Sequence, residues 1–231
     1  MTPGEIRILP LAGVPEVRAG DDLAELFVAA VGEGGLEDGD VLVVTQKVVS
    51  KVEGRVAPVA EKQAAIAAES KRILRRTPGG MVISETRHGF ICANAGVDES
   101  NVAQGTVVLL PLDADTSARR IRARVKHLVD KDIAVIVSDT FGRAWRNGQT
   151  DIAIGVAGIE PFLDYRGSLD TQGRELRATR IAVADELAGA AELVMGKADG
   201  ICAAIVRGAR VVRGRGSVAE IVRSPGDDLF R

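Results

Sequence analysis

The apolar positions of the chain fall into short runs separated by polar or glycine-rich segments. The clearest run, Ile133 to Val137, has five apolar residues in a row and stops at Ser138. An unbroken run of this length is typical of a strand that is buried on both faces. Similar runs predict further strands at residues 6–11, 41–44, 81–84, 89–93, 106–110 and 203–206.

Other segments place apolar residues at helical spacing. A helix is expected from Leu23, with Asp21 or Asp22 as its N-cap. Further helices are expected at residues 61–76, 113–128 and 181–195, and the polar section 164–177 predicts a hairpin or a mobile loop. Strands separated by uneven helices and turns favour an α+β fold with irregular mixed sheets and packed helices. We expect one domain over residues 1–231, built as two interleaved lobes.

Composition narrows the classes of function. The 231 residues are 46% hydrophobic and 27% charged, with a net charge of −2, so no positive field would recruit nucleic acid or an acidic membrane. No signal peptide and no apolar run of membrane-spanning length is present, which favours a cytoplasmic protein without membrane contact. Cys92 and Cys202 lack metal-ligand spacing and are interpreted as reduced thiols, although the sequence leaves a disulfide open.

Polar side chains gather directly after the Ile133 to Val137 run. Ser138, Asp139 and Thr140 come first, followed by Arg143 and Arg146, before the chain becomes apolar again at Ile152. Carboxylate, hydroxyl and guanidinium groups at the end of a strand suit a site for metal and phosphate. The alternative is a polar loop with structural ion pairs.

Three further groups are candidates with plain structural alternatives. Asp98 and Asn101 offer hard oxygen donors in a loop that an Asx-type turn would also explain. Lys47 and Lys51 follow the 41–44 run and suit phosphate, or are simply solvated. His88 is a possible base or ligand, but a lone histidine more often makes a structural hydrogen bond. No Walker loop, dinucleotide fingerprint, nucleophile elbow or H-E-x-x-H motif occurs, so a nucleotide would have to bind to scattered loops.

Taken together, these residues resemble the deazaflavin-coenzyme glutamate ligases, the gamma-glutamyl ligases that act on coenzyme F-420-0. The matching stretches are LPLAGVPEVRAGDDL, DGDVLVVTQKVVSKVEGR, ETRHGF, ANAGVDESN, VSDTFGRAWRNGQTDIAIG, AVADELA, LVMGK and PGDDLF. They run from near residue 8 to the C-terminus. Some family members carry a fused nitroreductase-like domain, and because this sequence ends after DDLFR, that second activity is not implied.

The resemblance implies GTP-dependent addition of L-glutamate to the phospholactyl carboxylate of a deazaflavin, and then of gamma-linked glutamates, through an acyl phosphate. It also implies Mg²⁺ or Mn²⁺ at two sites and a homodimer. By similarity, Asp98 and Asp139 bind one metal ion, while Thr140 and Gly196 belong to the second site. The nucleotide site would be lined by Val14, Pro15, Glu16, Val17, Gln46, Lys51, Asn101, Val194, Met195, Gly196, Lys197, Ala198, Asp199, Gly200 and Ile201.

Arg143 and Arg146 are added as catalytic candidates on chemical grounds, because guanidinium forks suit an acyl phosphate or substrate carboxylates. Their alternative is a structural pair with Asp139 or Asp151. Two other functions compete with the ligase: a metal-dependent phosphohydrolase, and a non-catalytic deazaflavin-binding or nucleotide-binding protein. The residues alone predict only a phosphate and divalent-metal site. The family resemblance is what ranks the ligase first.

Overall fold

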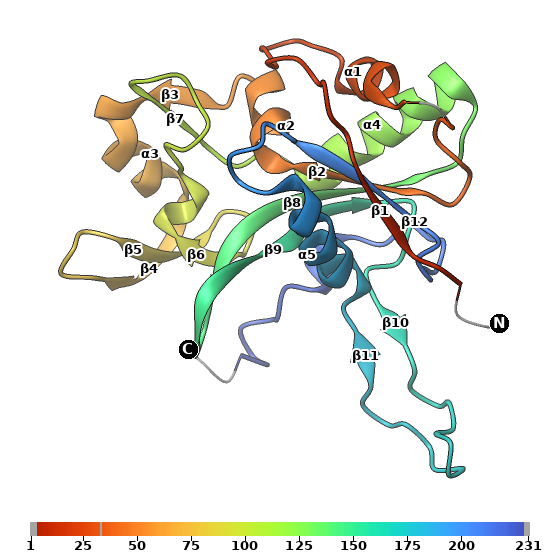
Figure 1. Cartoon of the computed structure of the whole chain (residues 1–231). Coiled ribbons are helices and arrows are strands. Elements are labelled where there is room, and N and C mark those ends of the chain that lie inside the picture. Colours follow the sequence, from red (N-terminus) through yellow and green to blue (C-terminus); the bar gives the residue numbers. More distant parts are fainter. Residues whose placement is uncertain (1–3, 33, 229–231) are drawn as a thin grey trace.

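The computed structural model describes residues 4–32 and 34–228, and its centre is a mixed five-stranded sheet (Figure 1). Strands β2 and β8 are parallel neighbours, and every other pairing in the sheet is antiparallel. This mixed architecture confirms the expected fold class. In spatial order the strands are β1 (Arg7–Pro10), β12 (Ala203–Arg207), β2 (Val41–Thr45), β8 (Ala134–Arg143) and β9 (Arg146–Ala157).

Helices cover both faces of this sheet, so the central strands are buried on each side. Val135 and Val137 of β8 belong to the cluster beneath α1, α2 and α4, whereas Ala134 and Ile136 pack with α5. The prediction that Ile133 to Val137 is buried on both faces is therefore confirmed. The helices are α1 (Leu23–Ala30), α2 (Gln46–Val52), α4 (Ala114–Val129) and α5 (Val183–Met195).

A smaller unit is inserted between α2 and α4, and Figure 1 shows it beside the main sheet. It has its own apolar cluster, which includes Ile66, Val82 and Val107. Its elements are β3 (Val56–Pro58), a 3₁₀ turn (Val59–Glu61), α3 (Lys62–Glu69), β4 (Ser70–Arg76), β5 (Val82–Thr86), β6 (Ile91–Ala93), a second 3₁₀ turn (Asn94–Gly96) and β7 (Thr106–Val108).

The expected helix over residues 61–76 is wrong in its second half. Helix α3 ends at Glu69, and the chain then continues as β4, antiparallel to β5. Lys71 and Arg72 of β4 both pair with the buried carboxylate of Glu85 on β5. The residues of β4 have no strong local preference for a strand, so pairing with a distant segment decides their structure.

The polar segment after Val137 is also not a loop. Strands β8 and β9 continue through it as a hairpin, with Asp139 opposite Ile152 and Thr140 opposite Asp151. A register shift between Val137 and Ser138 marks a bulge where the buried part of β8 becomes polar. The polar side chains are thus held on a rigid ladder, which fixes their positions more closely than a loop would.

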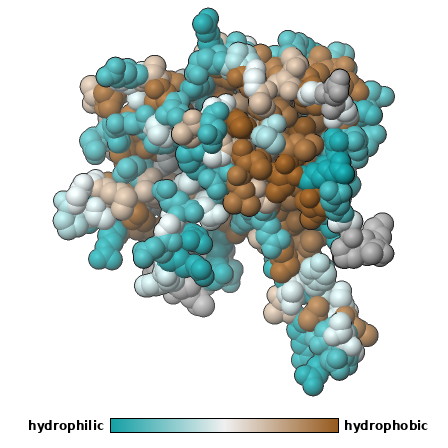
Figure 2. Space-filling model, in the orientation of Figure 1, coloured by the Kyte–Doolittle hydropathy of each residue, from teal (hydrophilic) through white to brown (hydrophobic). Residues whose placement is uncertain are grey.

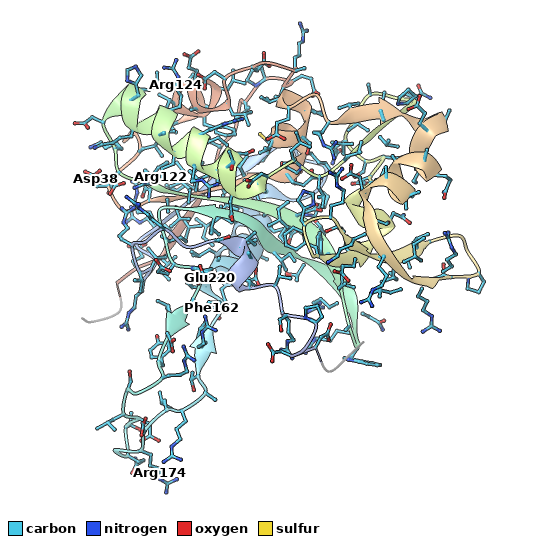
Figure 3. The ribbon with its side chains drawn as sticks, turned by 180° about the vertical axis from the view of Figure 1, so that it is seen from behind. Asp38, Arg122, Arg124, Phe162, Arg174 and Glu220 are labelled. Carbon is cyan, nitrogen blue, oxygen red and sulfur yellow. The ribbon has the colours of Figure 1, made fainter. Side chains whose placement is uncertain are left out.

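The expected hairpin around residues 164–177 is an arm that leaves the body of the molecule (Figures 1 and 3). Its base is the short pair β10 (Leu163–Asp164) and β11 (Arg180–Ile181). The guanidinium of Arg180 lies 3.8 Å from the centre of the Phe162 ring at this base. Arg174 lies near the far end of the arm in Figure 3.

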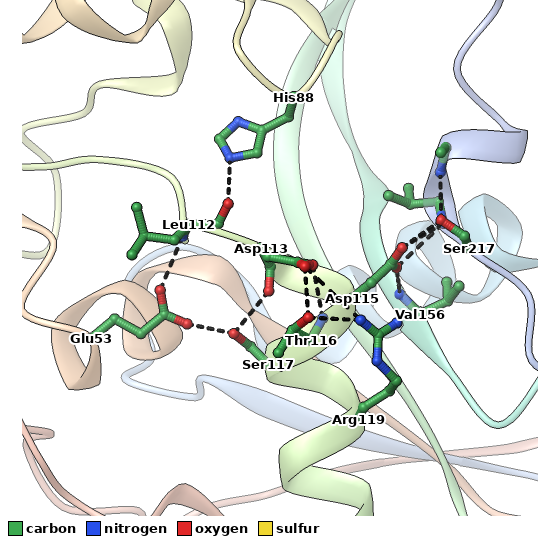
Figure 4. Close-up of polar contacts among 12 residues, drawn as sticks. Glu53, His88, Leu112, Asp113, Asp115, Thr116, Ser117, Arg119, Val156 and Ser217 are labelled. Atoms are coloured by element: carbon green, nitrogen blue, oxygen red, sulfur yellow. Dashed lines mark hydrogen bonds and ion pairs between the residues drawn. The ribbon is translucent and has the colours of Figure 1, made fainter.

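Two aspartates fix how the helices attach to the sheet. Asp22 is the N-cap of α1, as expected, and also pairs with Arg124 of α4 (Nε to Oδ2, 2.7 Å; Figure 3 labels Arg124). Asp115 at the start of α4 is buried and accepts hydrogen bonds from Val156 N of β9 (2.7 Å) and Ser217 Oγ of the C-terminal segment (2.6 Å; Figure 4). One carboxylate therefore joins three segments that are remote in sequence.

The described residues also test the expectations about a disulfide and about membrane-spanning segments. Cys92 and Cys202 are both free thiols, so no disulfide joins them. No helix within residues 4–32 and 34–228 has the length and apolar character needed to cross a membrane.

Figure 2 shows apolar residues gathered on the face of β1 and α5, where Leu9 and Leu193 are exposed. The end of the PGDDLF stretch, from residue 229, lies outside the described residues.

Candidate functional site

A cavity of about 630 Å³ lies where the parallel strands β2 and β8 end. Ligands of open α/β sheets commonly bind beyond the carboxyl ends of such strands. Most of the residues expected at the nucleotide site line this cavity, although they come from four separate parts of the chain. They are Val14, Pro15, Glu16, Val17, Gln46, Lys51, Asn101, Met195, Gly196, Lys197, Ala198, Gly200 and Ile201. Val194 and Asp199, which were also expected there, do not line it.

A second cavity, about 490 Å³, lies on the side of the inserted unit. Asp98, Asn94 and Gln149 are among its lining residues. The two cavities share one wall, because some residues line both. These shared residues are Lys47, Asn101, Asp139, Thr140 and Lys197.

Asp139 lies at this shared wall, where the ionised form of its carboxyl group is disfavoured. The pKa of its carboxyl group is raised to about 7, chiefly by burial and also by the nearby charges of Asp151 and Asp98, against the lowering effects of the Thr140 backbone hydrogen bond and Lys47. Asp98 behaves differently: burial acts to raise its pKa, but hydrogen bonds from Lys47 and Ser100 lower it overall. The structure thus brings together the two carboxylates that the sequence proposed as metal ligands, from segments far apart in the chain.

Asp151 is a site residue that was predicted only as the end of the polar segment and as a possible ion-pair partner of the arginines. Its carboxylate is 2% exposed and accepts hydrogen bonds from Thr140 Oγ1 (2.6 Å), Ser138 Oγ (3.1 Å) and Lys197 Nζ (2.9 Å). The signal for it is its place at the end of the polar segment, opposite Thr140 once the segment folds as a hairpin. The sequence does not reveal this strand register, so it could not identify Asp151 as a neighbour of Thr140.

Two lysines supply the positive charge of the shared wall. Lys47 Nζ lies 2.7 Å from Asp98 Oδ2 and also donates a hydrogen bond to Ser100 Oγ. Lys197 Nζ donates to Thr140 Oγ1 (2.7 Å) and pairs with Asp151 Oδ1 (2.9 Å). Lys47 reaches the shared wall from α2 and Lys197 from the segment after α5, so anionic groups entering either cavity meet positive charge there.

Three residues that line the first cavity have either a side-chain donor without a partner among the described residues or a positive φ angle. Gln46 is buried and accepts a hydrogen bond from Ser50 Oγ (2.9 Å), while its Nε2 donor has no partner among the described residues. Gly196 has a positive φ of 58°, and a methyl group there would lie 2.4 Å from Asp199 Oδ2. Asn101 also has positive φ (55°) and donates to Lys197 O (3.2 Å), which links both cavities.

The arginine candidates lie outside both cavities. Arg143 and Arg146 are exposed at the tip of the β8–β9 hairpin, one residue pair beyond Gly142 and Gln149 of the second cavity wall. Arg143 Nη2 donates to Asn147 O (2.9 Å), and no ion pair to Asp139 or Asp151 is present. His88 also stays apart, because its Nε2 is hydrogen-bonded to Leu112 O at 3.0 Å; Figure 4 draws this contact, which is a structural role.

The oxygen donors at and next to the shared wall suit a hard divalent cation whose coordination is completed by a bound ligand. Asp98, Asp139 and Thr140 offer only oxygen atoms, and Mg²⁺ is commonly bound by one or two carboxylates together with phosphate oxygens and water. No group of three or more His, Cys, Asp or Glu side chains in the described ranges is arranged to hold an ion by itself. The residues therefore suit an ion that arrives with a phosphate group better than a closed structural metal site.

Comparison with known proteins agrees with this geometry. The chain matches the family described as F420-0:Gamma-glutamyl ligase over residues 13–69 and 57–208. It is 43% identical to the Coenzyme F420:L-glutamate ligase of Methanothermobacter thermautotrophicus, over 98% of this chain and 99% of that protein. It is 44% identical to the enzyme of the same name from Methanopyrus kandleri (98% of each chain) and 40% identical to that of Archaeoglobus fulgidus (98% of this chain and 96% of that protein).

Proposed function

The chain belongs to the F420-0:gamma-glutamyl ligase family, and we propose that it couples GTP and a divalent cation to the attachment of L-glutamate to coenzyme F420-0. Family membership makes it a ligase that forms a glutamyl amide bond in F420 biosynthesis. The proposal adds the nucleotide, the metal ion and the route. It also adds further rounds, in which gamma-linked glutamates extend the product.

The chemistry requires activation of the acceptor. A carboxylate does not react with an amine at neutral pH because oxide is a very poor leaving group. Transfer of the γ-phosphoryl group of GTP to a carboxylate oxygen gives an acyl phosphate and GDP. The amine of glutamate then attacks the acyl carbon, loses a proton and releases phosphate, so two accessible steps replace one inaccessible step.

The observation that carries the proposal is the shared wall between the cavities. It places Asp139 and Thr140 beside Lys47 and Lys197, and Asp98, which lines the second cavity, pairs with Lys47 next to it; phosphoryl transfer requires such control of charge. A Mg²⁺ or Mn²⁺ ion would neutralise phosphate charge there, held by Asp98 and Asp139, with Thr140 and Gly196 serving a second ion. The residues of this chain would position the phosphates and the acceptor carboxylate against each other.

Supporting residues follow from the same geometry. The Nε2 of Gln46 has no acceptor among the described residues, and Gln46 lines the first cavity, where a nucleotide oxygen would satisfy this donor. Lys51, which pairs with Glu16 (2.6 Å), would border the same ligand. Arg143 and Arg146 are proposed to attract the anionic acceptor from the hairpin tip, since neither reaches the wall.

The test is a reaction of the purified protein with F420-0, L-glutamate, Mn²⁺ and either GTP or ATP, followed by mass spectrometry. The proposal predicts glutamylated product and GDP, with nucleotide turnover that requires both F420-0 and glutamate. Phosphate release from simple esters without either substrate would indicate a phosphohydrolase. Tight binding of F420-0 or GDP with no product would indicate a binding protein instead.

A homodimer is proposed for the protein in solution. The face of β1 and α5 exposes Leu9 (38%) and Leu193 (79%), and apolar patches of this kind mark contact surfaces (Figure 2). Light scattering coupled to size-exclusion chromatography should give twice the mass of one chain. Leu193→Glu should shift the protein towards the mass of one chain, and a wild-type mass of one chain would contradict the proposal.

A further inference from the structure

We propose that the second cavity receives the carboxylate end of the deazaflavin acceptor, while the nucleotide occupies the first cavity on the other side of the shared wall. This inference rests on the proposed function and assigns each substrate to its own place. The ligand proposed for the space bordered by Asn94, Gly96 and Gln149 carries a carboxylate. Neither the family description nor the names of the relatives assign a ligand to that space.

The shared wall is the first reason. In phosphoryl transfer the attacking oxygen approaches the phosphorus from the side opposite the leaving oxygen. The two substrates must therefore meet from opposite directions at one point, and Lys47, Asp139, Thr140 and Lys197 line both cavities at such a point. If both ligands occupied the first cavity, the second would have no place in the reaction, although it borders the same four side chains.

The second reason is the division of chemistry between the cavities. The first is the larger, at about 630 Å³, and its lining includes the glycine-containing segment around Gly196 and Gly200, where a bulky nucleotide can lie against the backbone. The second, at about 490 Å³, adds the neutral amides of Asn94 and Gln149. The side-chain amide of Gln149 makes no hydrogen bond to another described residue. It is free to donate to a carboxylate at the rim.

The third reason is the strained backbone that forms one side of the second cavity. Asn94, Ala95 and Gly96 have positive φ angles of 52°, 53° and 75° in succession. A methyl group at Gly96 would lie 2.5 Å from Leu110 Cγ, so the turn is pressed against the core. The Asn94 side chain supports it by accepting from Val82 N (3.0 Å). Consecutive non-glycine residues in this region are costly and are typically retained where a ligand needs the shape.

The assigned step is balanced as follows. A carboxylate oxygen of the acceptor in the second cavity forms a bond to the γ-phosphorus of GTP. The bond between that phosphorus and the bridging oxygen to the β-phosphate breaks, and its electron pair stays on GDP in the first cavity. The amine of glutamate then attacks the acyl carbon and loses a proton to solvent, while the bond from the acyl carbon to the phosphate oxygen breaks and phosphate leaves.

Two alanines offer a matched pair of variants. Ala93 and Ala198 are both exposed, and each lines only one cavity, the second and the first respectively. Ala93→Trp should weaken F420-0 binding, followed by the fluorescence of the deazaflavin, at least tenfold and leave GDP binding in the presence of Mn²⁺ within twofold. Ala198→Trp should do the opposite. Gln149→Ala, which removes only an exposed amide, should raise the KM for F420-0 several-fold and leave the KM for GTP unchanged.

The binding measurements separate this inference from the proposed function. Absence of glutamylated product with the wild-type protein would reject the function, yet the two ligands could still be located by direct binding. If Ala93→Trp weakens GDP and spares F420-0, or if both tryptophan variants weaken the same ligand, the assignment of the cavities is wrong. Thermal unfolding of each variant shows that it is folded, and if Ala93→Trp is not, the Gln149→Ala result decides.

Discussion

Asp139→Asn should stabilise the protein in the absence of metal at neutral pH while abolishing ligation. Burial, with the charges of Asp151 and Asp98 added, raises the pKa of Asp139 from 3.8 to about 7 in the folded state. The folded protein therefore holds this proton more tightly than the unfolded chain does. Stability is lost as the pH rises from about 4 to about 7, because the carboxyl group must ionise in a place that disfavours its charge.

The magnitude follows from the size of the shift. About three pKa units at roughly 1.4 kcal/mol each make the charged carboxylate cost about 4 kcal/mol at pH 8. At pH 5 the cost comes only from the interval between the ordinary pKa of 3.8 and pH 5, so it is about 2 kcal/mol. Asparagine has nearly the same shape and carries no charge. The variant should thus gain about 2–4 kcal/mol at pH 8, and less at pH 5.

Urea unfolding followed by circular dichroism, at pH 5 and pH 8 in the presence of EDTA, measures this gain. Asp130→Asn is the control, because Asp130 is exposed, pairs with Lys126 (2.8 Å) and has a lowered pKa, so its substitution should give no gain at pH 8. Millimolar Mn²⁺ together with GDP should stabilise the wild-type protein more than it stabilises Asp139→Asn. A variant that is equally or less stable than wild type at pH 8 would refute the reasoning, and near-normal glutamylation by it would refute the metal role.

Three further substitutions test other parts of the structure. Asp115→Ala should cost about 3 kcal/mol in urea unfolding, because Val156 N is left buried without its acceptor; a loss below about 1 kcal/mol would contradict this. Gly155→Ala should cost at least about 2 kcal/mol, since its methyl group would lie 2.4 Å from the carbonyl carbon of Ala114, whereas Gly79→Ala has open space and should be close to neutral. Lys197→Met should reduce glutamylation at least 100-fold with the protein still folded, whereas Lys71→Met, on the inserted unit, should retain activity in the same assay; equal effects of the two would remove Lys197 from the site.

Sequence alone was sufficient where local pattern dictates structure. The apolar run from Ile133 to Val137 predicted a strand buried on both faces, and Asp22 was one of two residues predicted to cap α1. The residues expected around a nucleotide were largely those that line the first cavity, because the resemblance extends over almost the whole chain.

Only the tertiary structure decided the features that depend on pairing between distant segments. The second half of the expected helix at 61–76 became β4 because β5 offers it a partner, which its own residues do not reveal. Asp151 became part of the site because the β8–β9 register sets it opposite Thr140. The register likewise carries Arg143 and Arg146 beyond the cavities. Periodicity reports which face of an element is buried, but the neighbour that buries it is set by long-range packing, and the shared wall between two cavities is a product of that packing.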